Sequence, residues 1–200
     1  MKKKSVAVVI ISNGPGELAT WVRPLLEQLN KKNESLFYSD KLNISLRLVL
    51  VPCPNATGKE FEVANSWNKF ELITKSRSFW KLLIKPHSFA NWPKKGAVIF
   101  LGGDQFWSIL LAKRLGYLNI TYAEWISRWP QWTNQIAAMN VKVKELMPKR
   151  YKNKCKVIGD LMADIKLNSE ISLRNKENQY IALLPGSKKA KLSVGIPFFL

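Results

Sequence analysis

Two loop-like segments carry the polar residues best placed for chemistry, and the first is Ser-Asn-Gly-Pro-Gly-Glu at residues 12–17. It follows the apolar run 6–11, and its glycines let backbone amides approach a ligand, while a following helix N-terminus favours an anionic or polar group. An ordinary strand-to-helix turn, with an acidic side chain stabilising the helix start, is the alternative. The spacing differs from a Gly-x-Gly-x-x-Gly fingerprint, so a dinucleotide site is disfavoured. The candidate binding residues are Asn13, Gly14, Gly16 and Glu17.

The second segment contains Asp104, which follows Gly102 and Gly103 after the apolar run 97–101. A carboxylate at this position can take a proton from a sugar hydroxyl. Aspartate is also among the preferred N-cap residues of helices. The sequence alone favours the cap over the catalytic role.

Aromatic residues cluster after the expected strand 119–122, with Trp125, Trp129 and Trp132 within eight residues. Aromatic rings with polar edges suit contact with a sugar or an acyl chain. Core packing of at least one tryptophan is the alternative. The candidate substrate-binding residues here are Tyr122, Glu124 and Trp125.

A fourth segment, residues 79–95, mixes bulky apolar and cationic side chains, as does an element lying on an anionic membrane. Burial of its apolar side inside the domain is the alternative. The formal net charge of +18 favours an anionic partner, and the sequence lacks recognisable nucleic-acid-binding signatures, so a membrane surface is the stronger expectation. The candidate membrane-associating residues are Phe79, Trp80, Leu82 and Leu83.

Composition places the chain among globular proteins, with 46% hydrophobic and 23% charged residues in 200. No apolar run approaches the roughly 18 residues of a membrane span. The N-terminal lysines and apolar run end in Ser-Asn-Gly-Pro-Gly and not in a cleavage site, which indicates a buried strand and a cytoplasmic protein. Cys53 and Cys155 form neither a disulfide framework nor a metal pattern.

The elements that must position these residues alternate between strands and helices. Strands are expected at 5–11, 46–51, 97–101, 119–122 and 156–159, and helices at 18–29, 61–70, 79–84 and 109–115. This alternation predicts an α/β fold with a Rossmann-like, doubly wound parallel sheet over residues 1–167. Polar residues 168–179 are expected to form a connector, and residues 180–200 the first strand and turn of an incomplete second α/β domain.

Taken together, the chain resembles lipid-A-disaccharide synthase, a two-domain GT-B glycosyltransferase. The most specific matches are Val-Ile-Gly-Asp-Leu-Met-Ala-Asp at 157–164 and Ile-Ala-Leu-Leu-Pro-Gly-Ser-Lys at 181–188. The family has Gly-His-x-x-x-Asp and Leu-Leu-Pro-Gly-Ser-Arg there, so Asp160 replaces a histidine and Lys188 an arginine. Weaker matches at 12–17, 102–107 and 122–132 follow the same order, with Asp104 displaced by one residue. The resemblance spans the whole chain and about half of the family's length.

The resemblance implies transfer of an acylated glucosamine from a UDP donor to an acylated glucosamine 1-phosphate, with inversion and without metal or other cofactor. It implies that Asp104 is the base, that Gly186, Ser187 and Lys188 contribute to the UDP pocket, and that the protein lies peripherally on the inner membrane. A non-catalytic truncated homologue that binds anionic lipid or a partner protein is the alternative.

Overall fold

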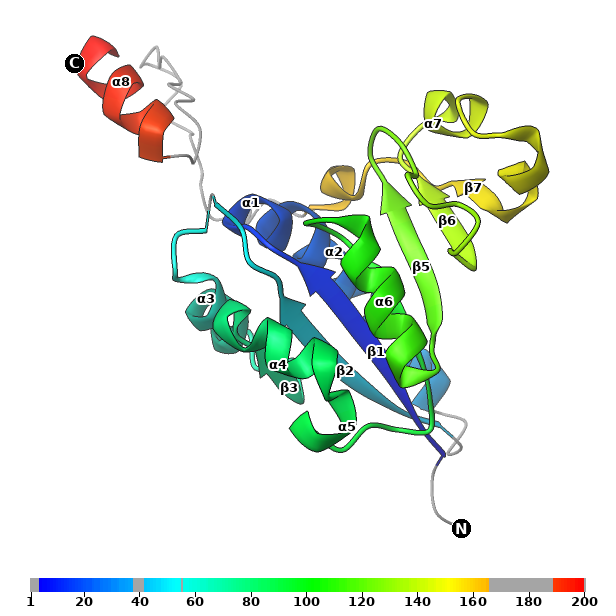
Figure 1. Ribbon diagram of the computed structural model, residues 1–200. Helices are drawn as coiled ribbons and strands as arrows, with labels where there is room; N and C mark the ends of the chain where they lie inside the picture. The colour runs from blue at the N-terminus through cyan, green and yellow to red at the C-terminus, as the bar shows by residue number, and fades with distance from the viewer. Residues whose placement is uncertain (1–3, 38–41, 55, 166–188, 200) are drawn as a thin grey trace. The chain divides into compact units, whose positions relative to one another are not determined.

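The computed structural model describes residues 4–37, 42–54, 56–165 and 189–199 (Figure 1). The chain divides into two units, Met1–Asp164 and Ile165–Leu200. In the second unit the structure describes helix α8 (Lys189–Phe199), which contains Pro197. The expected connector and the strand and turn at 180–188, including Gly186, Ser187 and Lys188, lie outside the described residues.

The first unit is built on a seven-stranded parallel sheet with the order β3-β2-β1-β4-β5-β6-β7. In the centre, Val9 of β1 pairs with Arg47 of β2 on one side and with Val98 of β4 on the other. This arrangement confirms the predicted Rossmann-like α/β fold. The strands are β1 (Lys4–Ser12), β2 (Leu42–Leu50), β3 (Leu72–Thr74), β4 (Lys95–Phe100), β5 (Leu118–Ala123), β6 (Gln135–Ala138) and β7 (Cys155–Val157).

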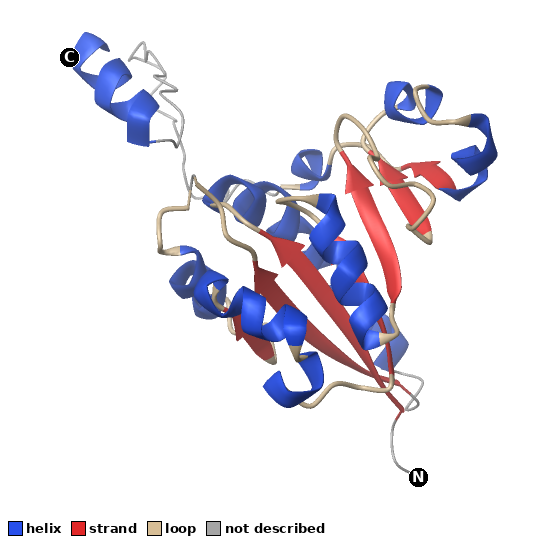
Figure 2. Cartoon of the chain, in the orientation of Figure 1, coloured by secondary structure: helices blue, strands red, loops and turns tan. Residues whose placement is uncertain are grey.

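Helices cover both faces of the sheet, as a parallel sheet requires (Figure 2). On one face Val9 and Ile11 of β1 belong to a core with α4 and α6, while Ile10 faces a second core with the 18–26 segment. The helical elements are α1 (Pro15–Glu17), η1 (Leu18–Val22), α2 (Arg23–Phe37), α3 (Glu60–Ser66), η2 (Ser76–Ser78), α4 (Phe79–Ile84), α5 (Pro86–Phe89), α6 (Gln105–Leu115), α7 (Val141–Glu145), η3 (Lys149–Lys154) and η4 (Leu161–Asp164).

The helix expected at 18–29 is longer and interrupted: it runs from Pro15 to Phe37 through a π-helical turn at η1. Pro24 has no N–H to donate to the carbonyl four residues earlier. The residue directly before it, Arg23, donates its N–H to the Leu18 carbonyl five residues earlier, which is the wider spacing of a π-helix. The wider turn thus accommodates the proline without ending the helix.

The prediction that the apolar side chains of α4 contact a membrane is wrong for three of the four residues. Phe79 and Leu82 are fully buried and Leu83 is 4% exposed, because α4 packs them into the core shared with the sheet and α6. Trp80 alone of the four is substantially exposed, at 49%. None of the described helices combines the length and hydropathy needed to cross a bilayer.

The β2–α3 connection is held by the buried carboxylate of Glu60. The Thr57 backbone N–H donates to its Oε1 at 2.6 Å, the Thr57 hydroxyl to the same oxygen at 3.0 Å, and the Gly58 N–H to Oε2 at 3.0 Å. Burial on its own raises the pKa of Glu60, but these hydrogen bonds outweigh it and leave that pKa below its ordinary value.

Replacing Glu60 with glutamine is therefore expected to lower the free energy of unfolding at neutral pH by about 1–3 kcal/mol. Because the folded pKa of Glu60 lies below the unfolded value near 4.5, its contribution is complete above that value. This contribution to stability is lost as the pH falls through the folded pKa. The unfolding free energies of the unmodified protein and the Glu60→Gln variant should therefore become equal in acid. Urea unfolding at several pH values measures this; a stability gap that does not change with pH would contradict it.

Candidate functional site

A cleft of about 490 Å³ lies at the carboxyl ends of β1, β2, β4 and β5. Parallel strands end at the same edge of a sheet, so loops far apart in sequence meet there. Residues following β1, β2, β4 and β5 each contribute to the wall. The lining residues are Asn13, Glu17, Trp21, Pro52, Cys53, Pro54, Phe100, Gly102, Gly103, Asp104, Gln105, Tyr122, Glu124, Trp125, Ile126 and Arg128.

Six of the residues predicted from sequence lie around this cleft: Asn13, Glu17, Asp104, Tyr122, Glu124 and Trp125. The other two loop residues, Gly14 and Gly16, are not among those that line it. The structure thus brings the polar residues of three loops together.

Asp104 forms the N-cap of α6, as the sequence favours. Its Oδ1 accepts a hydrogen bond from the Phe106 N–H at 2.9 Å. The side chain is also exposed and lines the cleft. A carboxylate has two oxygens with several acceptor positions, so capping the helix leaves acceptor capacity for a substrate hydroxyl.

Tyr122 joins the cleft to the segment that follows β7. Its hydroxyl donates to the Gly159 carbonyl at 3.4 Å and accepts from the Leu161 N–H at 3.3 Å. Burial raises the pKa of Tyr122, the Leu161 bond lowers it, and the carboxylates of Asp160 and Glu124 raise it further. The phenol therefore stays neutral at physiological pH and acts as a hydrogen-bonding group.

Asn13, one of the residues that line the cleft, has an acceptor atom without a partner. The Oδ1 atom of Asn13 is buried and has no hydrogen-bond partner among the described residues. A Cβ atom on Gly102 would lie 2.7 Å from this oxygen, so glycine at 102 is what leaves space for it. Buried polar atoms normally have a partner, and a ligand hydroxyl or amide N–H would supply one.

Gln105 fixes the β5–β6 loop to the start of α6. Its Nε2 donates to the Ile126 carbonyl at 2.8 Å, and its Oε1 accepts from the Arg128 N–H at 2.8 Å. Sequence reasoning missed these three lining residues, although Gln105 directly follows Asp104. Trp125 is 75% exposed beside the cleft.

Trp129 and Trp132 do not line this cleft. Their rings stack 5.1 Å apart at 15°. Of the three tryptophans expected to contact a sugar or an acyl chain, with core packing as the alternative for at least one, only Trp125 reaches the cleft.

Within the part of the chain that the structure describes, no three His, Cys, Asp or Glu side chains are grouped to hold a metal ion. His87 is exposed on α5, away from the residues that line the cleft.

No family model matches the chain, and no curated protein does either. Among solved structures, UDP-GlcNAc 2-epimerase from Methanocaldococcus jannaschii is similar at 14% identity and a TM-score of 0.49, over 78% of this chain and 45% of that protein. MnaA from S. aureus, in a co-structure with UDP, matches at 12% identity and a TM-score of 0.45, over 79% and 45%. The chain spans about half the length of these structures, and we base its function on the cleft itself.

Proposed function

We propose that the chain is the acceptor-side part of a lipid-A-disaccharide-synthase-like glycosyltransferase and that the cleft binds the sugar acceptor. The observation that carries the proposal is the meeting of three carboxylates, Glu17, Asp104 and Glu124, around one cleft that also presents Tyr122 and Trp125. Carboxylates accept hydrogen bonds from sugar hydroxyls, and aromatic rings pack against the apolar faces of sugars. The cleft thus has the two kinds of group that sugar binding needs.

The reaction would transfer an acylated glucosamine from a UDP donor to an acylated glucosamine 1-phosphate. Asp104 takes the proton of the acceptor hydroxyl while the oxygen of that hydroxyl attacks the anomeric carbon of the donor. The bond from that carbon to UDP breaks. UDP leaves with the bonding electrons, and the anomeric centre is inverted because the acceptor oxygen attacks the face opposite UDP. Gly186, Ser187 and Lys188 are proposed to stabilise the departing diphosphate through backbone amides and a lysine charge.

We also propose that the protein works at the cytoplasmic face of the inner membrane. Acylated substrates reside in that membrane, and a net charge of +18 is attracted to its anionic lipids. Since Phe79, Leu82 and Leu83 of α4 are buried, other residues would have to face the bilayer. Trp125 and Ile126, 75% and 53% exposed beside the cleft, have the apolar side chains for this role.

Replacing Glu124 with glutamine is expected to weaken the binding of N-acetylglucosamine by about tenfold, because a charged acceptor is replaced by a neutral one. Glu145→Gln is the matched control: it removes the same charge from an exposed position on α7, outside the cleft. Isothermal titration calorimetry measures both. Equal effects in the two variants, or the absence of saturable sugar binding in the unmodified protein, would refute the proposed acceptor site.

A non-catalytic binding protein is the second candidate, favoured by one observation. The hydrogen bond from the Phe106 N–H to Asp104 accounts for that aspartate without any catalytic role. This candidate predicts that the protein binds anionic vesicles and that the binding weakens as salt is added. It also predicts that replacing Asp104 changes only the stability of the protein.

A further inference from the structure

The helix that follows β1 contributes two side chains to the wall of the cleft. Glu17, at the end of α1, and Trp21, within the π-helical turn η1, both line it. They lie four positions apart, and residues at that spacing are neighbours on one side of a helix. The helix therefore presents a short row to the cleft, and Trp21 is the aromatic member of that row.

Two contacts hold the Trp21 ring beside the cleft. The ring is partly buried against the core that contains Ile10 and Val22. It also meets the Tyr122 ring edge-on, with the two ring centroids 5.5 Å apart at 65°, and Tyr122 lines the same cleft. A side chain that is already held in this way loses little conformational freedom when a ligand packs against it.

The π-helical turn determines which residues of this helix face the cleft. In a regular α-helix, with about 3.6 residues per turn, positions four apart drift by about 40° around the axis. A π turn contains more residues and offsets that drift. Leu18, Val22 and Leu26 accordingly stay in one buried row, at 1%, 0% and 3% exposure, although two four-residue steps separate the first from the last. The row of Glu17 and Trp21 lies beside it and keeps its direction for the same reason.

Pro24 makes a regular α-helix unfavourable at this point. Its ring would clash with the Thr20 carbonyl four residues earlier, and it has no N–H to donate to that carbonyl. Alanine at position 24 would permit the regular helix, in which the residues before the turn rotate by about 100° relative to α2. Trp21 would then leave its place in the cleft wall. Single π turns inside α-helices are frequent at functional sites.

We propose that Trp21 is a sugar-stacking residue of the cleft and that Pro24, through the π turn, is the residue that positions it. The inference rests on the proposed acceptor site and adds one ligand contact and its positioning residue to that site. The flat face of the indole packs against the apolar C–H face of a pyranose ring, while the carboxylates of the cleft accept hydrogen bonds from the sugar hydroxyls.

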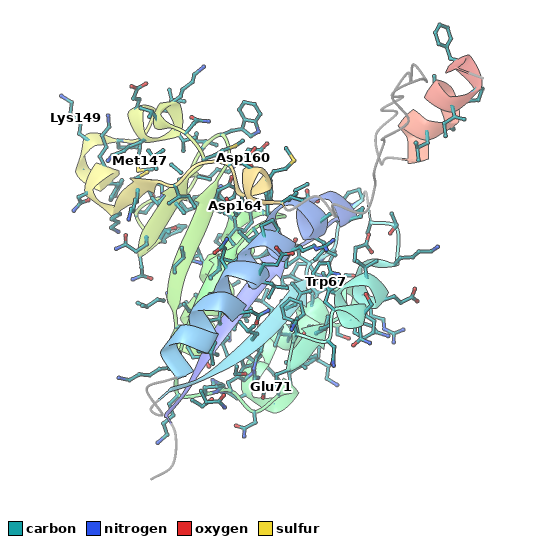
Figure 3. All side chains as sticks on the ribbon, turned by 180° about the vertical axis from the view of Figure 1, so that it is seen from behind. Trp67, Glu71, Met147, Lys149, Asp160 and Asp164 are labelled. Carbon is teal, nitrogen blue, oxygen red and sulfur yellow. The ribbon has the colours of Figure 1, made fainter. Side chains whose placement is uncertain are left out.

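Isothermal titration calorimetry with N-acetylglucosamine tests the stacking contact. Trp21→Ala should weaken binding about tenfold, and Trp21→Phe, which keeps an aromatic face, should weaken it no more than about threefold. Trp67→Ala is the matched control, because Trp67 is another partly buried tryptophan of the same core, lies beside α3 (Figure 3) and does not line the cleft. This control should lower the melting temperature, as Trp21→Ala does, and leave the affinity for the sugar unchanged.

Pro24→Ala tests the positioning role separately. Alanine is a far better helix former than proline, so the melting temperature of this variant should stay the same or rise. Its affinity for N-acetylglucosamine should nevertheless fall about tenfold, because the Trp21 contact is lost. A purely structural role for the proline predicts the reverse, a lower melting temperature with unchanged affinity.

The outcomes separate this inference from the proposed acceptor site. If Glu124→Gln weakens sugar binding and Trp21→Ala does not, the acceptor site stands and the stacking role is overturned. Equal losses of affinity in Trp21→Ala and Trp67→Ala also overturn it, since lost core packing would then account for both. Full affinity or a lowered melting temperature in Pro24→Ala overturns the positioning role. If the unmodified protein binds no sugar, the acceptor site and this inference both fail.

Discussion

Replacing Asp104 with asparagine is expected to reduce the rate of glycosyl transfer by about 10²- to 10⁴-fold, the usual contribution of a general base. Asparagine caps helices about as well as aspartate, so the hydrogen bond from the Phe106 N–H should survive and α6 should remain intact. The expected signature is a lost kcat with an unchanged melting temperature. Transfer from a UDP-sugar is measured in the full-length protein.

Asp104→Ala provides the control that separates catalysis from capping. Alanine removes both functions, so it should lose the activity and, in addition, about 1 kcal/mol of stability. If Asp104→Asn retains full activity, the residue is only a helix cap. The non-catalytic alternative would be preferred only if the unmodified protein shows no glycosyl transfer.

Phe79→Ala is expected to lower the free energy of unfolding by about 3–5 kcal/mol, the usual cost of truncating a large buried aromatic residue. Phe79 is fully buried, and its ring contacts those of Trp80 and Trp107 edge-on at centroid distances of 5.2 and 5.8 Å. A loss of this size is a large part of the stability of an ordinary domain. Chemical denaturation measures it.

Trp80→Ala is the control on the same helix. Trp80 is 49% exposed, so its replacement should lower the free energy of unfolding markedly less than Phe79→Ala does. The membrane interpretation of this segment makes the opposite forecast. It expects Phe79→Ala to weaken binding to anionic vesicles while the unfolding free energy stays constant. That result would show that α4 is not a core element in solution.

β1 and β4 could be predicted because each contains a run of consecutive apolar residues, 6–11 and 97–100, as burial on both faces demands. β3 and β6 escaped prediction because Leu72–Thr74 and Gln135–Ala138 are too short, with too few apolar residues, to show a period. The short helix α7 escaped for the same reason. Its first turn depends on Asn140, whose side chain accepts from the Val143 N–H at 3.2 Å.

The cleft could be predicted in part, because residues directly after parallel strands meet at one edge of the sheet. That rule found Asn13, Glu17 and Asp104. It could not find Trp21, which reaches the cleft from the helical segment η1. Such residues depend on how helices and loops pack, and a pattern along the chain does not encode packing. Burial of the apolar side of α4 was only the alternative interpretation, because a six-residue helix is too short to show which side is buried.

The position of β1 between β2 and β4 has a consequence for synthesis on the ribosome. Val6 needs Lys95 as its partner on one side, and synthesis at about 5–20 residues per second separates their appearance by several seconds. During that interval the apolar stretch 6–11 has an unsatisfied edge on the nascent chain. The lysines at positions 2–4 supply the flanking positive charge that discourages self-association of such a stretch. A slower-translated message, or loss of these lysines, should therefore lower the soluble yield without altering the stability of the finished protein.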